Sequence, residues 1–90
     1  MKKSYKLKYS KRFVKQIKRM DKFVQSNIMK WLDLNIQSTD NPRKHGKALV
    51  GNHKGKWRYR IGNYRVICVI EEEQLIILAL EVGHRNKIYK

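Results

Sequence analysis

The sequence is short of cysteine and of long apolar runs. Cys68 is the only cysteine, so an intramolecular disulfide is impossible, and its place in an apolar run predicts a buried side chain rather than a reactive thiol. The longest continuous apolar run, Leu75 to Leu80, has six residues, whereas a helix that spans a bilayer needs about twenty. The N-terminal stretch from Met1 to Lys6 has no apolar segment behind its charges, so no signal peptide is expected. We therefore expect neither a disulfide scaffold nor a membrane protein, and we predict a cytoplasmic location.

Acidic residues are also scarce, and basic residues are abundant. Asp and Glu number 7 against 22 Lys and Arg, so the chain of 90 residues carries a net charge of +15. This excess is far larger than solubility requires, and it indicates a polyanionic partner: nucleic acid, an acidic protein, or both. Apolar residues make up 41% of the chain, which is enough for a core and excludes a disordered basic tail. The length predicts a single domain over residues 1–90.

The first half of the chain predicts one strand followed by two helices. Apolar and basic residues alternate from Tyr5 to Tyr9, which is typical of a half-buried strand. Ser10 can cap a short helix whose apolar residues recur at helical spacing, at Phe13, Ile17 and Met20. Asp21 can cap a second helix with an apolar stripe that reaches Ile36. With almost no linker between them, the two helices should form an antiparallel hairpin.

The second half predicts a loop and three strands. Pro42 ends the helices, and the basic, glycine-containing stretch Arg43 to Lys56 should be mostly loop. Period-two patterns then predict strands over residues 56–61, 64–71 and 74–82, of which the last is apolar enough to lie inside a sheet. The order strand, helix, helix, strand, strand, strand predicts an α+β domain with its helices packed on one face of a sheet.

A two-residue turn at Gly62-Asn63 sets which side chains share a face. A type II′ hairpin turn places Ile61 opposite Tyr64, and Arg60 opposite Arg65. Residues directly opposite share a face, so one face carries the apolar and aromatic side chains and faces the helices. Its members are Trp57, Tyr59, Ile61, Tyr64, Val66 and Cys68.

The other face of this hairpin gathers Arg58, Arg60 and Arg65. Like charges directly across a strand pair are destabilising, so a functional reason is expected. All three residues are Arg although Lys outnumbers Arg 15 to 7 in the chain. Arg binds phosphate through a bidentate fork, whereas Lys offers only a point charge. The pattern therefore predicts a phosphate site.

The C-terminal stretch offers two side chains that could move a proton. His84 follows the predicted interior strand, and a histidine can act as a general acid or base near neutral pH. Neighbouring cations would favour the phenolate form of Tyr89. Either residue could instead be a bystander in a frayed tail. Arginines with a His or Tyr proton carrier suit RNA cleavage by the 2′-hydroxyl, a reaction that needs orientation, charge neutralisation and proton transfer.

Neither a metal ion nor a cofactor is expected from the residues. The acidic cluster Glu71 to Glu73 fits a solvated turn better than a metal site. His45 and His53 show no metal-ligand spacing. The glycines of the basic stretch do not precede a helix, so they do not form a nucleotide-binding phosphate loop.

Taken together, these residues resemble the RelE/ParE toxin superfamily, on its RelE side. The resemblance rests on the stretch from Trp57 to Ile67, on Val82 to Arg85 and on Tyr89. The segment from Lys47 to Gly51 and the strand-helix-helix opening are similar too, so the resemblance covers essentially the whole chain.

The resemblance implies a toxin of a type II toxin–antitoxin pair. RelE-like members cut mRNA in the ribosomal A site and are held inactive by an antitoxin. By position, Arg58 and Arg60 match the basic residues that hold the scissile phosphate, and Arg65 matches the arginine that orients it. Arg85 matches the residue that assists the leaving 5′ oxygen, and Tyr89 the general base. The expected products are a 2′,3′-cyclic phosphate and a 5′-hydroxyl, and further RNA contacts are expected from Lys47, Lys54, Lys56 and Lys87.

One departure from the RelE pattern affects the assignment of the base. The strand pair is lysine in the best-known RelE pattern, whereas both positions are Arg here. Arg does not lose its proton in proteins, so proton transfer is not expected from Arg58 or Arg60. His84 therefore stays an alternative to Tyr89 as the base.

Two other functions remain open at this stage. A ParE-type toxin shares the fold but poisons DNA gyrase, and it would not need the arginines or Tyr89. A non-enzymatic RNA-binding protein would fit the charge, although the hairpin register turns its aromatic rings away from the arginines. The basic helix faces could be merely solvated or could contact ribosomal RNA; they carry Lys11, Lys15, Lys18, Lys22 and Lys30.

Overall fold

The computed structural model describes residues 3–86. Along this part of the chain the elements are β1 (Lys6–Tyr9), α1 (Lys11–Lys18), α2 (Lys22–Asn35), β2 (Lys47–Ala48), a 3₁₀ turn (Gly51–His53), β3 (Trp57–Ile61), β4 (Tyr64–Glu71) and β5 (Ile76–His84). None of the helices in the described residues is long and apolar enough to cross a bilayer.

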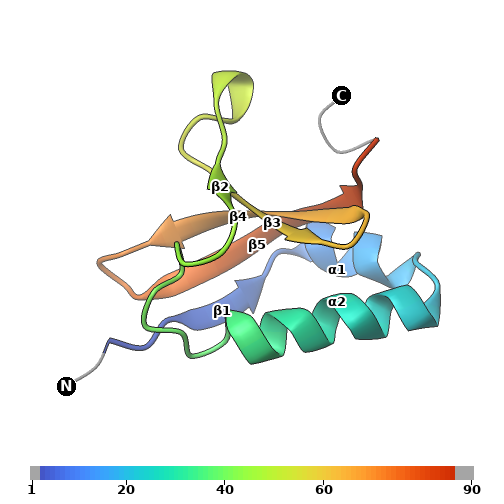
Figure 1. Ribbon diagram of the computed structural model, residues 1–90, viewed down its shortest axis with the longest axis horizontal. Helices are drawn as coiled ribbons and strands as arrows, with labels where there is room; N and C mark the ends of the chain where they lie inside the picture. The colour runs from blue at the N-terminus through green and yellow to red at the C-terminus, as the bar shows by residue number, and fades with distance from the viewer. Residues whose placement is uncertain (1–2, 87–90) are drawn as a thin grey trace.

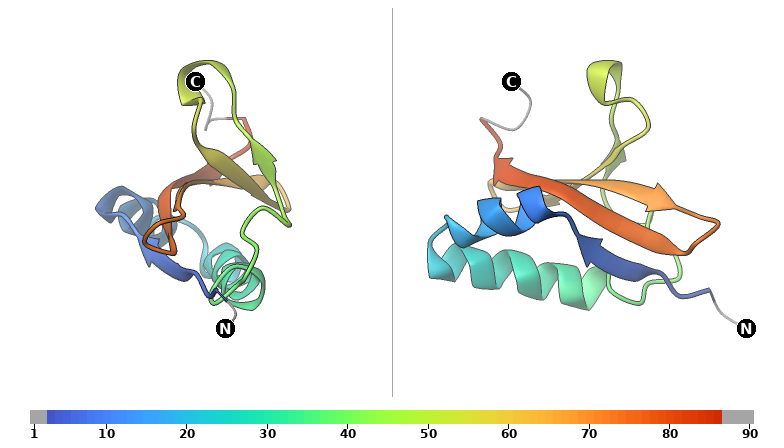
Figure 2. Two further views of the ribbon diagram at one scale, coloured as in Figure 1. Left: turned by 90° about the vertical axis from the view of Figure 1, so that its left-hand side faces the viewer. Right: turned by 180° about the vertical axis from the view of Figure 1, so that it is seen from behind.

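The five strands form one sheet in the order β1-β5-β4-β3-β2. β1 runs parallel to β5, and the other neighbouring strands are antiparallel. Both helices lie on one side of this sheet and run in opposite directions, while the segment after β2 projects on the other side (Figures 1 and 2). The predicted α+β architecture with helices on one sheet face is confirmed.

The hydrophobic core fills the space between the helices and the sheet. α1 contributes Phe13 and Ile17, and α2 contributes Ile28 and Leu32. From the sheet, alternate residues of each strand point toward them. The sheet residues of the core are Leu7, Tyr59, Val66, Cys68, Ile77, Ala79 and Val82. We call this side of the sheet the helix face.

Helix α1 occupies the edge of β5 where β1 has ended. Ser10 caps the helix by accepting a hydrogen bond from the backbone N–H of Phe13 at 3.0 Å, and its hydroxyl donates to the carbonyl of Leu80 at 2.8 Å. One turn later, Oε1 of Gln16 accepts from the backbone N–H of Val82 at 2.8 Å. These bonds satisfy backbone groups of β5 that no strand pairs, and they fix α1 against the sheet.

The structure differs from the sequence prediction at β2 and at the ends of β5. The stretch 43–56 is mostly loop, as predicted, but Lys47 and Ala48 add a fifth strand beside β3. A strand of two residues has no alternation to reveal it. β5 begins at Ile76 because Leu75 takes a φ of +55° in the turn before it, and it runs on to His84 because pairing with β4 continues to Tyr64.

Candidate functional site

The β3–β4 hairpin has the register that the sequence predicted. Ile61 lies opposite Tyr64, and Arg60 lies opposite Arg65. Gly62 takes a φ of +59° and Asn63 does not have a positive φ, as a type II′ turn requires at these two positions. The aromatic side chains Trp57, Tyr59 and Tyr64 therefore lie on the helix face.

The opposite face of the hairpin brings the three predicted arginines together. We call it the arginine face and define it by Arg58, Arg60 and Arg65. Arg60 is exposed and Arg58 is half-buried, whereas Arg65 is only 7% exposed. Neighbouring guanidinium groups can surround an anion, since each offers several N–H donors in a planar fork.

Arg65 is held close to the hairpin turn. Its Nη1 donates to the carbonyl of Tyr64 at 3.2 Å and more weakly to that of Gly62 at 3.4 Å. On its other side it lies opposite Gly83 of β5, which has no side chain to cover the guanidinium. These contacts hold the positive charge of Arg65 in place at the turn end of the hairpin.

β2 adds a lysine to the arginine face. Lys47 lies directly opposite Arg58 in the β2–β3 ladder, so the two side chains share this face. Lys47 is exposed. The structure therefore brings together four cations from three strands. One of these strands, β2, was not predicted from the sequence.

The loop before β2 is fastened to the helix side of β3. The indole Nε1 of Trp57 donates to the carbonyl of His45 at 2.7 Å, and the hydroxyl of Tyr59 donates to that of Pro42 at 2.6 Å. Arg43 lies 5.8 Å from the centre of the Trp57 ring and forms a 2.8 Å ion pair with Glu72. We call residues 42–46 the latch loop, because these contacts hold β2 in register.

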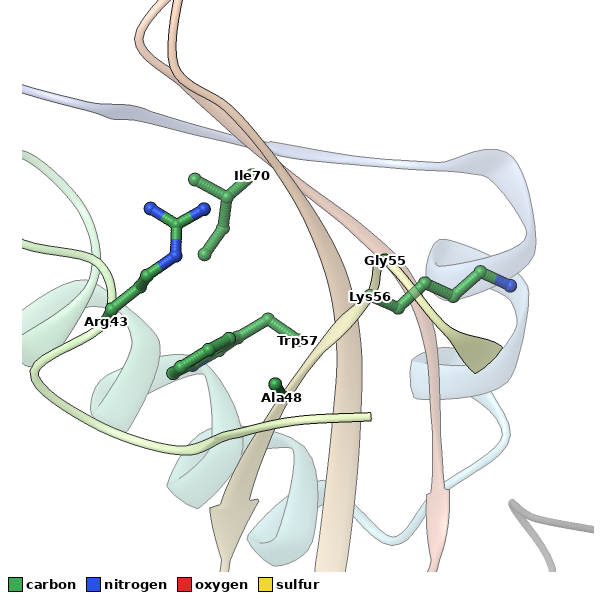
Figure 3. A pocket seen from close by; sticks show the side chains of 6 residues that line it. All are labelled: Arg43, Ala48, Gly55, Lys56, Trp57 and Ile70. Atoms are coloured by element: carbon green, nitrogen blue, oxygen red, sulfur yellow. The ribbon is translucent and has the colours of Figure 1, made fainter. Parts of the chain in front are cut away.

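The remaining predicted lysines of this region point away from the latch loop. Figure 3 shows the side chain of Lys56 extending away from Arg43 and Trp57. Lys56 is half-buried, and Lys54 is exposed on the segment that projects from the sheet (Figure 1). The pocket in Figure 3 is small, about 190 Å³, and it lies on the helix side.

The end of β5 separates His84 from the arginine face. His84 lies opposite Tyr64, and their rings meet edge to face with centres 5.5 Å apart, so His84 lies on the helix face. Its Nδ1 accepts a hydrogen bond from the backbone N–H of Asn86 at 3.3 Å. The exposed Arg85 donates its backbone N–H to the carbonyl of Asn63 at 2.9 Å, which holds it beside the hairpin turn. The predicted residues Lys87 and Tyr89 lie outside the described residues.

Two buried groups on the helix face do not take part in this site. Burial raises the pKa of Tyr59 and of Cys68 well above their usual values, so both stay neutral at physiological pH. Cys68 is fully buried and is therefore a core residue, as predicted. Within residues 3–86, no three side chains of His, Cys, Asp or Glu are arranged to hold a metal ion.

The sequence as a whole identifies the family. Residues 7–89 match the sequence model of the family described as ParE toxin of type II toxin-antitoxin system, parDE. The chain belongs to this toxin family. No curated protein sequence matches it.

Solved structures of toxins have the same fold as this member of the RelE/ParE toxin superfamily. The RelBE2 toxin–antitoxin complex of Mycobacterium tuberculosis matches with a TM-score of 0.79 and 21% identity, over 91% of this chain and 99% of that one. The RelE–RelB complex of Pyrococcus horikoshii OT3 matches with a TM-score of 0.71 and 24% identity, over 93% and 98%. The isolated RelE toxin of E. coli matches with a TM-score of 0.71 and 19% identity, over 90% and 84%.

The expected membership of the RelE/ParE superfamily is thus confirmed. The matching family is named after ParE, whereas these three structures contain RelE toxins. The sequence prediction did not include the latch loop or the pairing of Lys47 with Arg58. In the sequence, Gly46 and the polar end of the Trp57 indole point to a close contact in this region. Neither residue indicates its partner before the fold is known.

Proposed function

We propose that this toxin is an endoribonuclease that cuts mRNA without a metal ion. The observation that supports the proposal is the register of β2, β3 and β4, in which Arg60 lies opposite Arg65 and Lys47 lies opposite Arg58. Paired like charges destabilise a sheet, so a bound phosphate that offsets their repulsion is the simplest reason for the arrangement.

In the proposed reaction, the 2′-hydroxyl of the substrate attacks the adjacent phosphate. A bond forms between the 2′ oxygen and phosphorus as the bond to the 5′ oxygen breaks, which leaves a 2′,3′-cyclic phosphate and a 5′-hydroxyl. The base takes the proton of the 2′-hydroxyl, and a second proton is delivered to the leaving 5′ oxygen. Arg58, Arg60 and Arg65 hold the phosphate and stabilise the charge that develops on it, and Arg85 assists the leaving oxygen.

We assign the general base to Tyr89, with His84 as the alternative. His84 lies on the helix face, with its ring against Tyr64, whereas the arginines lie on the other face. A base must come within hydrogen-bond reach of the proton that it removes. The location of His84 therefore favours Tyr89, the position that the family resemblance suggests.

The partners of this toxin are inferred from its relatives and from its charge. The related structures from M. tuberculosis and P. horikoshii are complexes of a toxin with an antitoxin. We infer that this chain too is held inactive by a cognate antitoxin, and that it acts in the cytoplasm on mRNA in the ribosomal A site. Its net charge of +15 supports contacts with ribosomal RNA as well.

Primer extension on a defined mRNA in a translating extract tests this function. Wild type should cut in register with codons only when ribosomes are present, whereas the Arg60→Gln and Tyr89→Phe variants should lose most of the cutting. Arg60 is exposed, so its substitution should leave the fold intact, and substitution of the exposed Lys3, Lys3→Gln, removes an equal charge as the control. Retained cutting by Tyr89→Phe would move the base to His84. Absence of cutting by the wild-type chain would overturn the proposal.

Poisoning of DNA gyrase is the second candidate, because the matching family is named after ParE. A gyrase poison should tolerate both Arg58→Ala and Tyr89→Phe, since neither residue has a catalytic task in that role. A supercoiling assay with purified gyrase distinguishes the two functions. Inhibition that both variants retain, together with intact mRNA, would establish the gyrase function instead.

A non-enzymatic RNA-binding protein is less well supported. Base stacking needs exposed aromatic rings beside cations. Here Tyr59 is fully buried, and Trp57 and Tyr64 pack against the core on the face opposite the arginines. Quenching of Trp57 fluorescence by RNA would count in favour of this reading.

A further inference from the structure

A second cationic surface lies on helix α1, apart from the arginine face. Four cations and one amide line an open hollow of about 420 Å³ along the helix: Lys11, Arg12, Lys15, Gln16 and Arg19. We call it the α1 surface. Figure 1 shows α1 near the end of the sheet where the β3–β4 turn and the end of β5 lie, but on the helix side.

Helix stability accounts for only some of the charges of the α1 surface. Lys11 stands in the first turn, which contains no acidic residue, although the positive end of the helix dipole favours acids there. Lys15 and Arg19 lie at the C-terminal end of α1, where the dipole favours cations. However, Lys15 follows Lys11 by four residues and Arg19 follows Lys15 by four, and like charges at this spacing repel each other. A bound anion would offset this repulsion and the unfavourable position of Lys11.

Little within the protein neutralises the α1 surface. Arg12 forms an ion pair with Glu81 at 3.4 Å, but its side chain is 70% exposed, and such pairs contribute little. Within residues 3–86, no carboxylate lies within 4 Å of Lys11, Lys15 or Arg19. These three ammonium and guanidinium groups are therefore available to a ligand.

The α1 surface is rigid, and its lining is polar. Phe13 and Ile17 anchor the opposite side of α1 in the core, and Gln16 bonds it to β5. None of the five lining side chains is apolar. Protein partners and membranes are bound through apolar or aromatic anchors, which this hollow lacks. A row of cations on a fixed helix instead suits a chain of phosphates, with a spacing of about 6 Å between residues four apart.

We propose that the α1 surface binds the sugar-phosphate backbone of folded RNA, as a docking site separate from the arginine face. The inference rests on the proposed function, which brings the toxin to RNA. Both surfaces lie at the same end of the sheet but on opposite sides of it, so a single strand that continues from RNA held on α1 has to pass around this end to reach the arginines. The contact reads no bases, so it is independent of sequence and sensitive to salt.

The docking site is tested by measuring the binding of a labelled RNA hairpin. Fluorescence anisotropy gives the affinity at each of a series of NaCl concentrations. The variant Lys11→Gln/Lys15→Gln/Arg19→Gln removes three charges from the α1 surface. The control Lys3→Gln/Lys6→Gln/Lys44→Gln removes three exposed charges elsewhere. Circular dichroism verifies that both fold. Three lost phosphate contacts should lower the slope of log affinity against log salt concentration by about 2 to 3. A fourfold rise in salt should therefore cost wild type about 16- to 64-fold more affinity than the α1 variant.

The control variant should keep a slope close to that of wild type. Equal loss of slope in both triple variants would overturn the proposal, because only net charge would then matter. Loss of binding to polyglutamate without loss of binding to RNA would overturn it in favour of an acidic protein partner. The result is separable from the proposed function: a chain that does not cut mRNA but shows the selective loss of slope keeps the docking site and refutes the nuclease.

Discussion

At the scale of single residues, two buried side chains carry protons that the folded protein does not readily release. Tyr59 is fully buried, with its hydroxyl 2.6 Å from the carbonyl of Pro42. Burial is the main cause of its raised pKa; a thiolate at Cys68 would raise it further, while Arg43 lowers it. Burial also raises the pKa of Cys68. Both groups are therefore neutral in the fold over a wider range of pH than in the unfolded chain.

We expect the free energy of unfolding to fall above about pH 9. The folded pKa values are raised, so above the ordinary values of 9.0 for Cys and 10.0 for Tyr the unfolded chain binds fewer protons than the folded one. The stability from these groups is complete below those values and is lost as pH rises, by up to about 1.4 kcal/mol per pH unit for each group. Urea unfolding of wild type, Tyr59→Phe and Cys68→Ala from pH 7 to 11 measures this.

Each substitution should make the free energy of unfolding fall less steeply above about pH 9, because one raised pKa is removed. The titration of the lysines is common to all three proteins. Tyr59→Phe should also cost about 1–2 kcal/mol at pH 7, because the carbonyl of Pro42 loses its donor. Parallel pH profiles in the three proteins would contradict the assignment.

At the scale of elements, the short strand β2 depends on the latch loop. Two residues cannot hold a register by themselves, and the bonds from Trp57 to His45 and from Tyr59 to Pro42 fix the chain just before it. Gly46 permits the close approach with a φ of +83°. A Cβ at this position would overlap the carbonyl oxygen of Arg58 and lie 2.7 Å from Nε1 of Trp57.

We expect Gly46→Ala to cost about 2–4 kcal/mol of stability and to reduce RNA cleavage, because Lys47 would lose its place opposite Arg58. Gly55→Ala is the matched control. Gly55 also has a positive φ, of +93°, but a Cβ there would meet nothing within 4 Å, so only a backbone cost of about 1 kcal/mol is expected. Urea unfolding and the primer-extension assay measure the two effects. Equal losses in both variants would show that the close approach is unimportant.

At the scale of the whole molecule, repulsion among cations acts across the entire fold. The radius of gyration is 12.5 Å, comparable to the screening length of about 10 Å at 0.1 M salt. Against the net charge of +15, acidic residues are few, and the ion pairs seen between described residues are Arg12–Glu81 and Arg43–Glu72. Screening therefore removes more repulsion than attraction.

We expect NaCl to stabilise the fold while it weakens RNA binding. Between 0.05 and 0.5 M NaCl the free energy of unfolding should rise by roughly 1 kcal/mol or more, since each like-charge pair that is screened contributes a few tenths. Urea midpoints at each salt concentration measure the effect. The Lys3→Gln/Lys6→Gln/Lys44→Gln variant, with three fewer charges, should gain less stability from added salt. A midpoint that falls with added salt would show that attraction dominates.

Much of the fold could be predicted from the sequence, because the relevant signals are local. The alternation at β1 and the caps at Ser10 and Asp21 marked the first strand and both helices. Gly62 set the hairpin register, because a two-residue turn leaves one pairing of the flanking strands. The face shared by the three arginines followed directly from that register.

Other features required the tertiary structure. β2 and the latch loop depend on contacts between residues up to 17 positions apart, such as Tyr59 with Pro42. The face on which His84 lies depends on a bulge between β4 and β5 near Ile67, which shifts the alternation along β5. The position of α1 depends on the edge that β1 leaves unpaired on β5.

The sequence by itself determined the charge, the order of the elements other than β2, and the arginine pairing, because each depends on composition or on short-range spacing. Only the tertiary structure decided which lysine joins the arginines, which face His84 occupies, and that the cations of α1 form a separate surface. These depend on which strands and helices become neighbours, and long-range packing, not spacing along the chain, determines that.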